Sequence, residues 1–340
     1  MIDNRCIIRQ KALIRGIIFD FNEENLYLNM NTFAEALKKS VFNADIYRRL
    51  RTYYVALRVK EILLIGGVTF IGLVFSTTIY DQNTVLRWFL IMLSSYTLLG
   101  HSFASNDWSG YKYDKNDINK KARPLIKGEL SLAEIKVLCI SLLIVSLTLA
   151  AIVSYISFLM VIGIVILNYL YSGEKVFLKS VPVVSTMIHG VGASLGFLLG
   201  YGYMGYLDFT GVSFAVYFGI IYAAGHLNHE ISDLDSDKLS GIPTNADLLG
   251  KKKAYILSFV LFSFSFVYII LLSVSHVLPQ TIIVGVMIAY PVYSYYFWRT
   301  LYSPLSYESM VNFRRRYRFI FLFWGIFLTL SIIVNKRLTG

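Results

Sequence analysis

Residues 98–117 read LLGHSFASNDWSGYKYDKND, an apolar stretch that passes directly into a cluster of acidic and amide side chains. A second transition of this kind occurs at residues 219–237, which read GIIYAAGHLNHEISDLDSD. Carboxylates at a membrane boundary are costly unless something cationic holds them, so they favour a functional role. Two such clusters suggest divalent metal ions that grip a polyanion, above all a diphosphate.

The composition is that of a polytopic membrane protein. The chain has 340 residues, of which 56% are apolar and only 16% are charged, whereas an ordinary soluble domain has about 25% charged residues. A helix that crosses the hydrocarbon core needs about 20 mostly apolar residues. We therefore predict an all-α membrane protein with about nine transmembrane helices. The predicted spans are 61–80, 84–105, 131–152, 156–172, 181–203, 209–229, 254–275, 278–298 and 318–335.

The positive charges predict the orientation of these spans. With the N-terminus on the cytoplasmic side, 29 of the 32 Lys and Arg residues fall on that side or at the inner end of a span. The outer side keeps only Arg87, Lys336 and Arg337. This is a strong positive-inside bias, and it places both acidic clusters on the cytoplasmic face. The net charge of +11 is thus a topology signal, and we expect membrane lipids but no nucleic acid as partners.

Two regions are expected along the chain. Residues 1–55 are polar and basic and form a cytoplasmic or interfacial extension, within which 31–51 has the pattern of an amphipathic helix. Residues 56–340 form one transmembrane domain. Within it, Gly192, Ala193 and Gly196 are expected to let neighbouring helices approach closely.

The acidic clusters have helical spacing. If the second span continues as a helix, Asn106, Asp107, Asp114 and Asp117 lie within one arc of about 100°. In the second cluster the acidic residues also share one face, and oxygen ligands of this kind suit Mg²⁺. The alternative is a solvated acidic loop that forms salt bridges with nearby lysines. Two clusters on the same side of the membrane favour the metal. The acidic residues of the second cluster are Glu230, Asp233 and Asp237.

The two clusters resemble the signatures of the UbiA-type intramembrane prenyltransferases. Residues 106–128 are similar to the first signature, N-D-x-x-D-x-x-x-D followed by R-P-L-x-x-G, and residues 230–250 to the second, D-x-x-D-x-x-x-D with G-I-x-T and L-G downstream. Residues 169–179 resemble the Tyr and Lys that follow the fourth helix of that family. The resemblance covers about residues 55–335.

The resemblance implies an all-helical bundle around a central cavity, in which Mg²⁺ ions bind an isoprenyl diphosphate and the prenyl group passes to an acceptor. Aromatic acids and phenols are the commonest acceptors in similar proteins, and the acceptor stays open here. By position, the implied metal ligands are Asn106, Asp114, Glu230, Asp233 and Asp237, and the implied diphosphate-binding residues are Asn106, Arg123 and Lys179.

The chain departs from the family pattern at three positions. Gly110 replaces the middle Asp of the first signature and offers no ligand. Either Asp107 or Asp117 takes over its catalytic role, or one metal site is weakened, or the chemistry differs. Glu230 replaces an Asp and can still bind a metal. Val59 replaces the Pro of an Arg-Pro pair that the family often has near the start of the first helix, and Arg58, which matches the Arg of that pair, is a further catalytic candidate.

Two polar or aromatic groups beside the clusters are further candidates. Tyr171 lies next to the third match, and an aromatic face can stabilise a carbocation. His226, Asn228 and His229 precede the second cluster, and one of them could bind the substrate by a hydrogen bond or serve as a base for the acceptor; we assign Asn228 to the diphosphate. The alternative for all three is that they are polar residues at the end of a helix with no role in catalysis.

We therefore predict a Mg²⁺-dependent prenyltransferase that uses an isoprenyl diphosphate donor within the membrane. The nearest alternative is a terpene cyclase on the same scaffold. In such an enzyme the double bonds of the prenyl chain itself attack the carbocation, and no acceptor is needed. A third hypothesis is a transporter or binding protein for an anionic lipid, and it predicts that the acidic residues of the second cluster are dispensable.

Overall fold

The computed structural model describes residues 44–77, 80–115, 117–173 and 176–339. Contacts divide the chain into two units, Met1–Val55 and Ala56–Gly340. Most of the expected amphipathic helix at 31–51 lies outside the described residues, which begin with α3. The helices are α3 (Ala44–Ala56), α4 (Val59–Ile65), α5 (Gly67–Ser76), α6 (Gln82–Ser109), α7 (Tyr111–Asp114), α8 (Leu132–Val153), α9 (Tyr155–Ser172), α10 (Val184–Tyr201), α11 (Phe209–Leu239), α12 (Asn245–Leu249), α13 (Lys251–Val274), α14 (Thr281–Leu301) and α15 (Tyr307–Thr339), with the 3₁₀ turns η1 (Ile118–Lys120), η2 (Leu178–Ser180) and η3 (Gly202–Met204).

The prediction of an all-α membrane protein is confirmed. In the described part of the chain, eight helical stretches are long and apolar enough to cross a membrane. They are α4 with α5, α8, α9, α10 with η3, α11, α13, α14 and α15. The remaining predicted span, 84–105, lies within α6, a helix of 28 residues that is not among these eight stretches.

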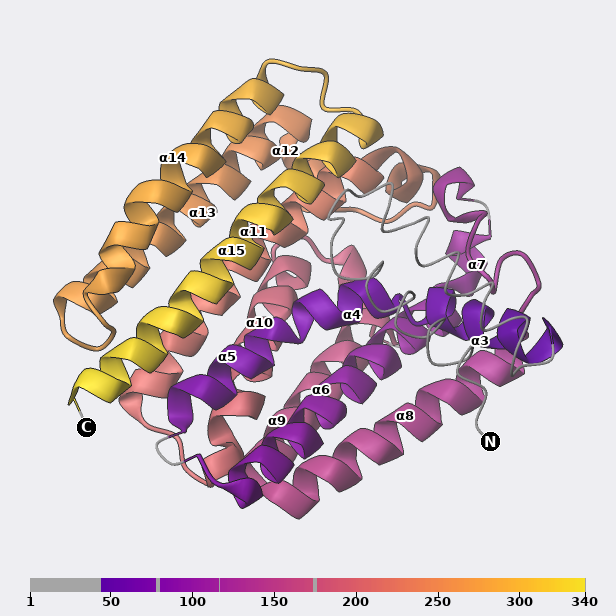
Figure 1. Ribbon diagram of the computed structural model, residues 1–340. Coiled ribbons are helices and arrows are strands. Elements are labelled where there is room, and N and C mark those ends of the chain that lie inside the picture. The colour runs from indigo at the N-terminus through magenta and orange to yellow at the C-terminus, as the bar shows by residue number, and fades with distance from the viewer. Residues whose placement is uncertain (1–43, 78–79, 116, 174–175, 340) are drawn as a thin grey trace, which may run out of the picture. The chain divides into compact units, whose positions relative to one another are not determined.

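Two helices form the middle of the larger unit. Helix α10 packs against α5, α9 and α11, and α11 in turn packs against α13 and α15. Helices α6, α8 and α9 lie together on one side, and α13, α14 and α15 on the other (Figure 1). The second acidic cluster therefore belongs to a central helix, and the first follows a helix of the flanking group.

Glycines allow the central helices to come into direct contact. A Cβ on Gly200 of α10 would lie 2.0 Å from the Thr69 carbonyl oxygen of α5, and one on Gly72 would lie 2.3 Å from the Phe197 carbonyl oxygen. The hydroxyl of Thr69 donates to the Gly196 carbonyl at 2.9 Å across the same contact. Lipid tails are as apolar as the helix surfaces, so such close packing supplies much of the attraction between membrane helices.

The expectation that Gly192 and Gly196 provide the close contacts is wrong. A Cβ on either of them would meet nothing within 4 Å. Gly190 is the residue that faces α11, where its Cβ would lie 2.9 Å from the Gly219 carbonyl oxygen. The small residues of α10 lie on several faces, and the sequence alone does not show which face a neighbouring helix covers.

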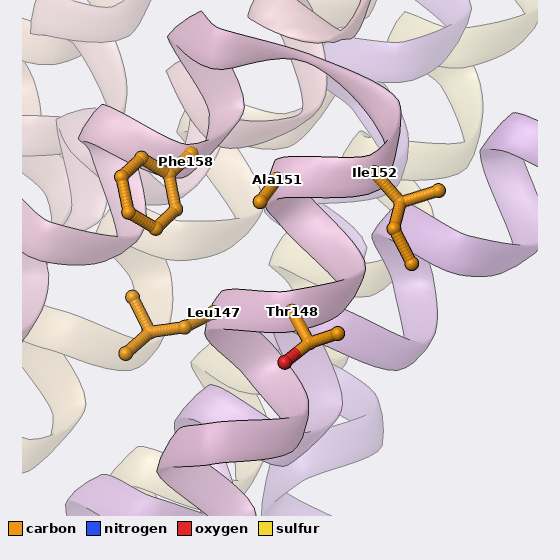
Figure 2. Close-up of a pocket in the computed structure, with 5 residues that line it drawn as sticks. All are labelled: Leu147, Thr148, Ala151, Ile152 and Phe158. Atoms are coloured by element: carbon orange, nitrogen blue, oxygen red, sulfur yellow. The ribbon is translucent and has the colours of Figure 1, made fainter.

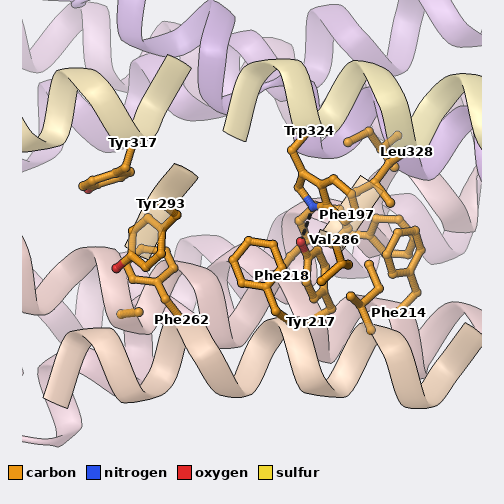
Figure 3. Packing of buried hydrophobic residues seen from close by; sticks show 14 of the residues in the cluster. Phe197, Phe214, Tyr217, Phe218, Phe262, Val286, Tyr293, Tyr317, Trp324 and Leu328 are labelled. Carbon is orange, nitrogen blue, oxygen red and sulfur yellow. Dashed lines mark hydrogen bonds between the residues drawn. The ribbon is translucent and has the colours of Figure 1, made fainter. Parts of the chain in front are cut away.

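Aromatic side chains fill the space between α10, α11, α13 and α15. Phe197 packs on Phe214 and Phe218, with ring centroids 5.1 Å apart in both pairs. The indole N–H of Trp324 donates to the Tyr217 hydroxyl, so a buried polar atom has its partner (Figure 3). This cluster fixes α11 against its neighbours and thereby orients the acidic face at the helix end.

Two of the three basic residues predicted on the outer side cap helix ends. Arg87 donates to the Tyr203 carbonyl oxygen at 2.6 Å and to that of Val153 at 3.1 Å. Lys336 donates to the carbonyl oxygens of Val74 at 3.0 Å and Thr77 at 2.6 Å. Carbonyls in the last turn of a helix have no partner within the helix. These cations therefore have a structural role that does not depend on topology.

We expect Gly200→Ala to destabilise the protein by about 1–3 kcal/mol, because a methyl group forces α5 and α10 apart. Gly192→Ala on the same helix is the matched control, and it should leave the melting temperature unchanged or slightly raised, since Ala favours a helix over Gly. Thermal unfolding of both variants in one detergent checks this. Equal melting temperatures for the two variants would contradict the contact.

Candidate functional site

A hollow of about 460 Å³ lies where α8 ends and α9 begins. The first acidic cluster comes before the other end of α8 in the chain. The walls of the hollow are Leu147, Thr148, Ala151, Ile152 and Phe158, and a single hydroxyl faces it (Figure 2). It has no group that could bind a metal or an anion, so an acyl chain of the bilayer suits it better than a polar substrate. The chemistry of this protein is to be sought at the acidic clusters.

The first acidic cluster leaves the helix that precedes it. Helix α6 ends at Ser109 with Gly110 as its C-cap, and the chain continues through the single turn of α7 and then η1. The assumption that 106–117 continues the second span as one helix is thus wrong. Gly has the lowest helix propensity after Pro, and here it marks the end of the helix. The chain instead folds back so that all three Asp side chains of this cluster become buried.

Three cations hold these carboxylates. Asp107 accepts from Arg58 and, at 2.9 Å, from Arg123. Asp114 accepts from Arg123 at 2.7 Å and from Lys120 at 2.7 Å. Buried carboxylates need such partners, because loss of the compensating charge costs several kcal/mol. Among the described residues, the cations that hold the first cluster are thus side chains of the protein itself.

Arg58 reaches the cluster from an unusual backbone conformation. It precedes α4 with φ 53° and ψ 48°, the left-handed region, which costs a non-glycine residue of order 1 kcal/mol or more. Its guanidinium lies 4.7 Å from the centre of the Phe103 ring while it donates to Asp107. The bend before α4 thus directs a cation onto the end of α6.

A direct hydrogen bond joins the two acidic clusters. The Ser236 hydroxyl of α11 donates to Asp117 Oδ2 at 2.6 Å. Burial alone would raise the pKa of Asp117, but this bond, the Asn119 N–H and Lys120 together hold that pKa below its usual value. Burial alone would lower the pKa of Lys120, but Asp114 and Asp117 outweigh it and raise that pKa. Segments 119 residues apart in sequence therefore share one charged network.

The second cluster stays on one helix, as the spacing predicts, because α11 runs unbroken to Leu239. Glu230 faces α10 and α12, where its Oε1 accepts from the Ser185 hydroxyl at 3.1 Å and from Asn245 Nδ2 at 3.0 Å. The same Asn245 amide donates to the Thr186 hydroxyl at 3.1 Å, and its Oδ1 accepts from the backbone N–H of Val183 at 2.8 Å. Glu230 is therefore oriented by a network of neutral donors.

Asp233 lies about one turn further along α11 than Glu230, and Asp237 lies about two turns further. Asp233 accepts from the Ser232 hydroxyl at 2.9 Å, and Asp237 is buried. Lys179, in η2, interacts electrostatically with both. Burial lowers the pKa of Lys179, and Asp237 opposes that shift. An ammonium group here thus stands between α11 and the first cluster, since it also interacts with Asp114.

Aromatic rings stack beside Glu230. The His189 and His226 rings are 3.9 Å apart, and Tyr171 packs edge-on against His189 at 4.8 Å. His226 Nδ1 lies 3.0 Å from the Thr186 hydroxyl and 3.5 Å from Glu230 Oε1. Tyr171 and His189 are both half-buried.

Two buried polar side chains of α11 have atoms without a hydrogen-bond partner among the described residues. Both amide atoms of Asn228 and the Oε2 of Glu230 make no hydrogen bond. Such atoms are rare in folded proteins and indicate a ligand, an ion or water. Asn106 is half-buried in the last turn of α6. Within the part of the chain that is described, no group of three or more His, Cys, Asp and Glu side chains is placed to hold one metal ion.

The structure also brings in residues that the sequence did not single out. Lys120 bridges two carboxylates, Ser236 joins the clusters, and Asn245 orients Glu230. Ser236 lies between Asp233 and Asp237, and Asn245 follows the Thr of the second signature. Only this closeness to the signatures could have suggested them, because Ser and Asn are common in loops and at helix ends.

Solved structures share this arrangement of helices. A structure described as that of digeranylgeranylglyceryl phosphate synthase matches with a TM-score of 0.64 and 20% identity, over 85% of this chain and 99% of that one. A UbiA homolog from Archaeoglobus fulgidus bound to DMAPP and Mg²⁺ matches with a TM-score of 0.64 and 19% identity, over 83% of this chain and 99% of that one. A UbiA homolog from Aeropyrum pernix K1 matches with a TM-score of 0.63 and 15% identity, over 82% of this chain and 98% of that one.

At these identities the structural matches show the fold. No relative is found among the curated proteins. The profile of the UbiA prenyltransferase family, however, matches residues 65–331, which include both acidic clusters and all of α6 to α14. The chain is therefore a multi-pass integral membrane protein, and it belongs to the UbiA prenyltransferase family.

Proposed function

We propose that this protein transfers an isoprenyl group from an isoprenyl diphosphate to an acceptor within the membrane, with Mg²⁺ at the two acidic clusters. The observation that carries the proposal is the hydrogen bond between Asp117 and Ser236, which brings both clusters to one place. The A. fulgidus homologs were solved with DMAPP or GPP and Mg²⁺, and the family assignment supports the same class of donor.

The residues present fit magnesium. Mg²⁺ takes oxygen ligands, and in phosphate-binding sites one or two carboxylates suffice because substrate oxygens and water complete the shell. Asp233 and Asp237 offer carboxylates on one side, and Asp114 and the Asn106 amide offer oxygens on the other. The Glu230 Oε2 and the Asn228 amide are free of other hydrogen bonds among the described residues. When bound, the metal neutralises the negative charge that grows on the leaving diphosphate.

The basic residues have capacity left for the diphosphate. Arg123 and Arg58 each contact carboxylates through a single terminal nitrogen, and a guanidinium has five N–H donors. Lys179 makes no ion pair in the described part of the chain, so its three donors are available. In the proposed complex Arg123, Lys179 and the Asn228 amide bind phosphate oxygens, while Arg58 keeps Asp107 in place.

The aromatic groups suit the other end of the reaction. An allylic carbon gains positive charge as the diphosphate leaves, and the face of an aromatic ring stabilises such charge. Tyr171 borders the interior beside His189, next to Glu230. The surrounding apolar helices accept the prenyl tail and exclude water, which would otherwise quench the cation.

We assign residues 56–340 to the catalytic domain and residues 1–55 to an extension on the cytoplasmic side, with both clusters facing that side, as the distribution of Lys and Arg indicates. The acceptor is a second substrate, which reaches the allylic carbon from the interior. The alternative of a terpene cyclase has no support among these relatives.

The acidic residues of α11 provide the most direct experiment. We expect Asp233→Asn and Asp237→Asn each to reduce diphosphate release from geranyl and geranylgeranyl diphosphate at least about 100-fold, because each removes a metal ligand and its charge. EDTA should abolish the wild-type activity and added Mg²⁺ should restore it. The measurement is diphosphate release by purified protein in nanodiscs, with a panel of phenolic and phosphate-bearing acceptors.

Asp235→Asn is the matched control, since Asp235 lies on the same helix, is exposed and pairs with Lys251 at 3.1 Å. It should retain full activity. If Asp233→Asn and Asp237→Asn behave like Asp235→Asn, the enzyme proposal fails, and a transporter or binding protein for an anionic lipid becomes the better explanation.

The link between the clusters can be tested separately. Ser236→Ala removes the hydroxyl that donates to Asp117, and we expect the free energy of unfolding to fall by about 1 kcal/mol. We also expect a several-fold higher Mg²⁺ concentration for half-maximal diphosphate release. Ser109→Ala is the control, because that hydroxyl bonds only within α6, to the Ser105 and Asn106 carbonyls. Equal Mg²⁺ requirements in both variants would show that the link does not set the geometry of the site.

A further inference from the structure

The basic run Arg314-Arg315-Arg316 near the start of α15 divides into two faces. Arg315 is exposed, and Arg316 stacks over the Tyr296 ring at 5.1 Å. Arg314 instead turns toward α11, where its guanidinium contacts His229 Nδ1. Arg318 follows Arg314 by four residues and so lies on the same face of α15. A lipid anchor accounts for the first face but does not account for the second.

The inward arginines have no carboxylate partner. Arg314 and Arg318 are half-buried, and neither forms an ion pair with any described Asp or Glu. Glu230, the acid nearest in sequence to His229, forms no ion pair with either arginine, and its Oε1 accepts from Ser185 and Asn245. A charge in a membrane bundle that has no counter-ion is costly and indicates a functional site.

The groups around these arginines are hydrogen-bond donors. An arginine can only donate, so His229 Nδ1 accepts from Arg314, and the imidazole proton is then on Nε2. Arg318 interacts electrostatically with His229 and with Tyr222, and both rings are enclosed by protein yet keep accessible surface. Two guanidinium groups, an imidazole N–H and a phenol thus converge on one interior region.

This region adjoins the proposed diphosphate site but differs from it. His229 precedes Glu230 directly, and Arg58, which holds Asp107, interacts electrostatically with His229. The diphosphate cations Arg123 and Lys179 belong to other segments and are coupled to Asp107, Asp114 and Asp237. Two separate sets of cations therefore lie on either side of the first turns of the second cluster.

We propose that Arg314 and Arg318, with His229 and Tyr222, form a binding site for a carboxylate or phosphate group. A guanidinium pairs with either anion through two parallel hydrogen bonds, which also fixes its orientation. The anion belongs to the acceptor, a role that rests on the proposed prenyl transfer, or to the headgroup of an anionic phospholipid. In the first case the site orients the acceptor toward the allylic carbon and selects acidic acceptors over neutral ones.

The test is anion binding in nanodiscs of phosphatidylcholine, a lipid without net charge. Calorimetric titration with benzoate and with inorganic phosphate should show binding to the wild type, and benzamide, the neutral analogue of benzoate, should not bind. Arg314→Gln combined with Arg318→Gln should weaken binding of the anions at least about tenfold. Arg315→Gln combined with Arg316→Gln removes the same charge from the same turns of α15 and should leave the affinity within about twofold.

Two further measurements identify the source of the anion. If phosphatidylglycerol in the nanodisc displaces benzoate, and co-purifies with the wild type but not with the Arg314/Arg318 variant, the site holds a lipid headgroup. If phosphatidylglycerol has no effect and the Arg314/Arg318 variant raises the KM only for acidic acceptors, the site holds the acceptor.

Binding of inorganic pyrophosphate with Mg²⁺ distinguishes this inference from the proposed function. The Arg314/Arg318 variant should bind pyrophosphate as the wild type does. If both double variants lose anion affinity equally, or if pyrophosphate binding falls as far as benzoate binding, the arginines act only through long-range charge and the inference is wrong. A wild type that binds benzoate but releases no diphosphate from any donor would instead refute the proposed function and leave the anion site intact.

Discussion

The fold brings buried carboxylates to the end of a membrane span, and this is possible only because each of them has a positively charged or hydrogen-bonding partner. Arg58, Lys120 and Arg123 come from the segments before and after α6 and converge on Asp107 and Asp114. Gly110 keeps a helical backbone conformation, and the chain leaves it after α7, where Asp117 is extended. This turn lets Lys120 and Arg123 reach Asp114. The charges thus determine the path of the chain as much as they determine its chemistry.

The second cluster depends on the opposite property, a helix that does not break. Helix α11 has 31 residues, and its apolar part is held by the aromatic rings of α10 and α15, so the acidic end projects from a fixed base. The close approach of Gly190 to Gly219 sets how far α10 lies from α11. Glu230 can reach Ser185 only at such a short distance between helices. The packing of the apolar part of α11 against α10 and the orientation of Glu230 at the polar end of α11 are therefore coupled.

Much of this could be predicted from the sequence, because hydrophobic length, charge bias and signature spacing are properties of single segments. Eight of the nine predicted spans and the unbroken helix that carries Glu230, Asp233 and Asp237 belong to this kind of information. The path of residues 106–117 could not be predicted in this way, because their spacing fits a continuous helix equally well. The attraction of Asp114 for Lys120 and Arg123, which favours a turn over a helix, comes from residues outside the segment. The contacts of the α10 glycines and the Ser236–Asp117 bond arise from tertiary packing, which leaves no periodic pattern in the sequence.

The replacement of the middle Asp of the first signature by Gly110 has an electrostatic consequence. A Cβ at this position would lie 3.7 Å from Asp114 Oδ2, so an Asp side chain here would add a fourth carboxylate beside Asp114. With Gly110, three carboxylates at 107, 114 and 117 face three cations, and the first cluster is neutral without a metal. A divalent ion bound to a neutral cluster leaves a net positive charge for the diphosphate, whereas a fourth carboxylate would cancel part of it. In the proposed complex, the glycine would therefore weaken the binding of the metal and strengthen the attraction for a diphosphate.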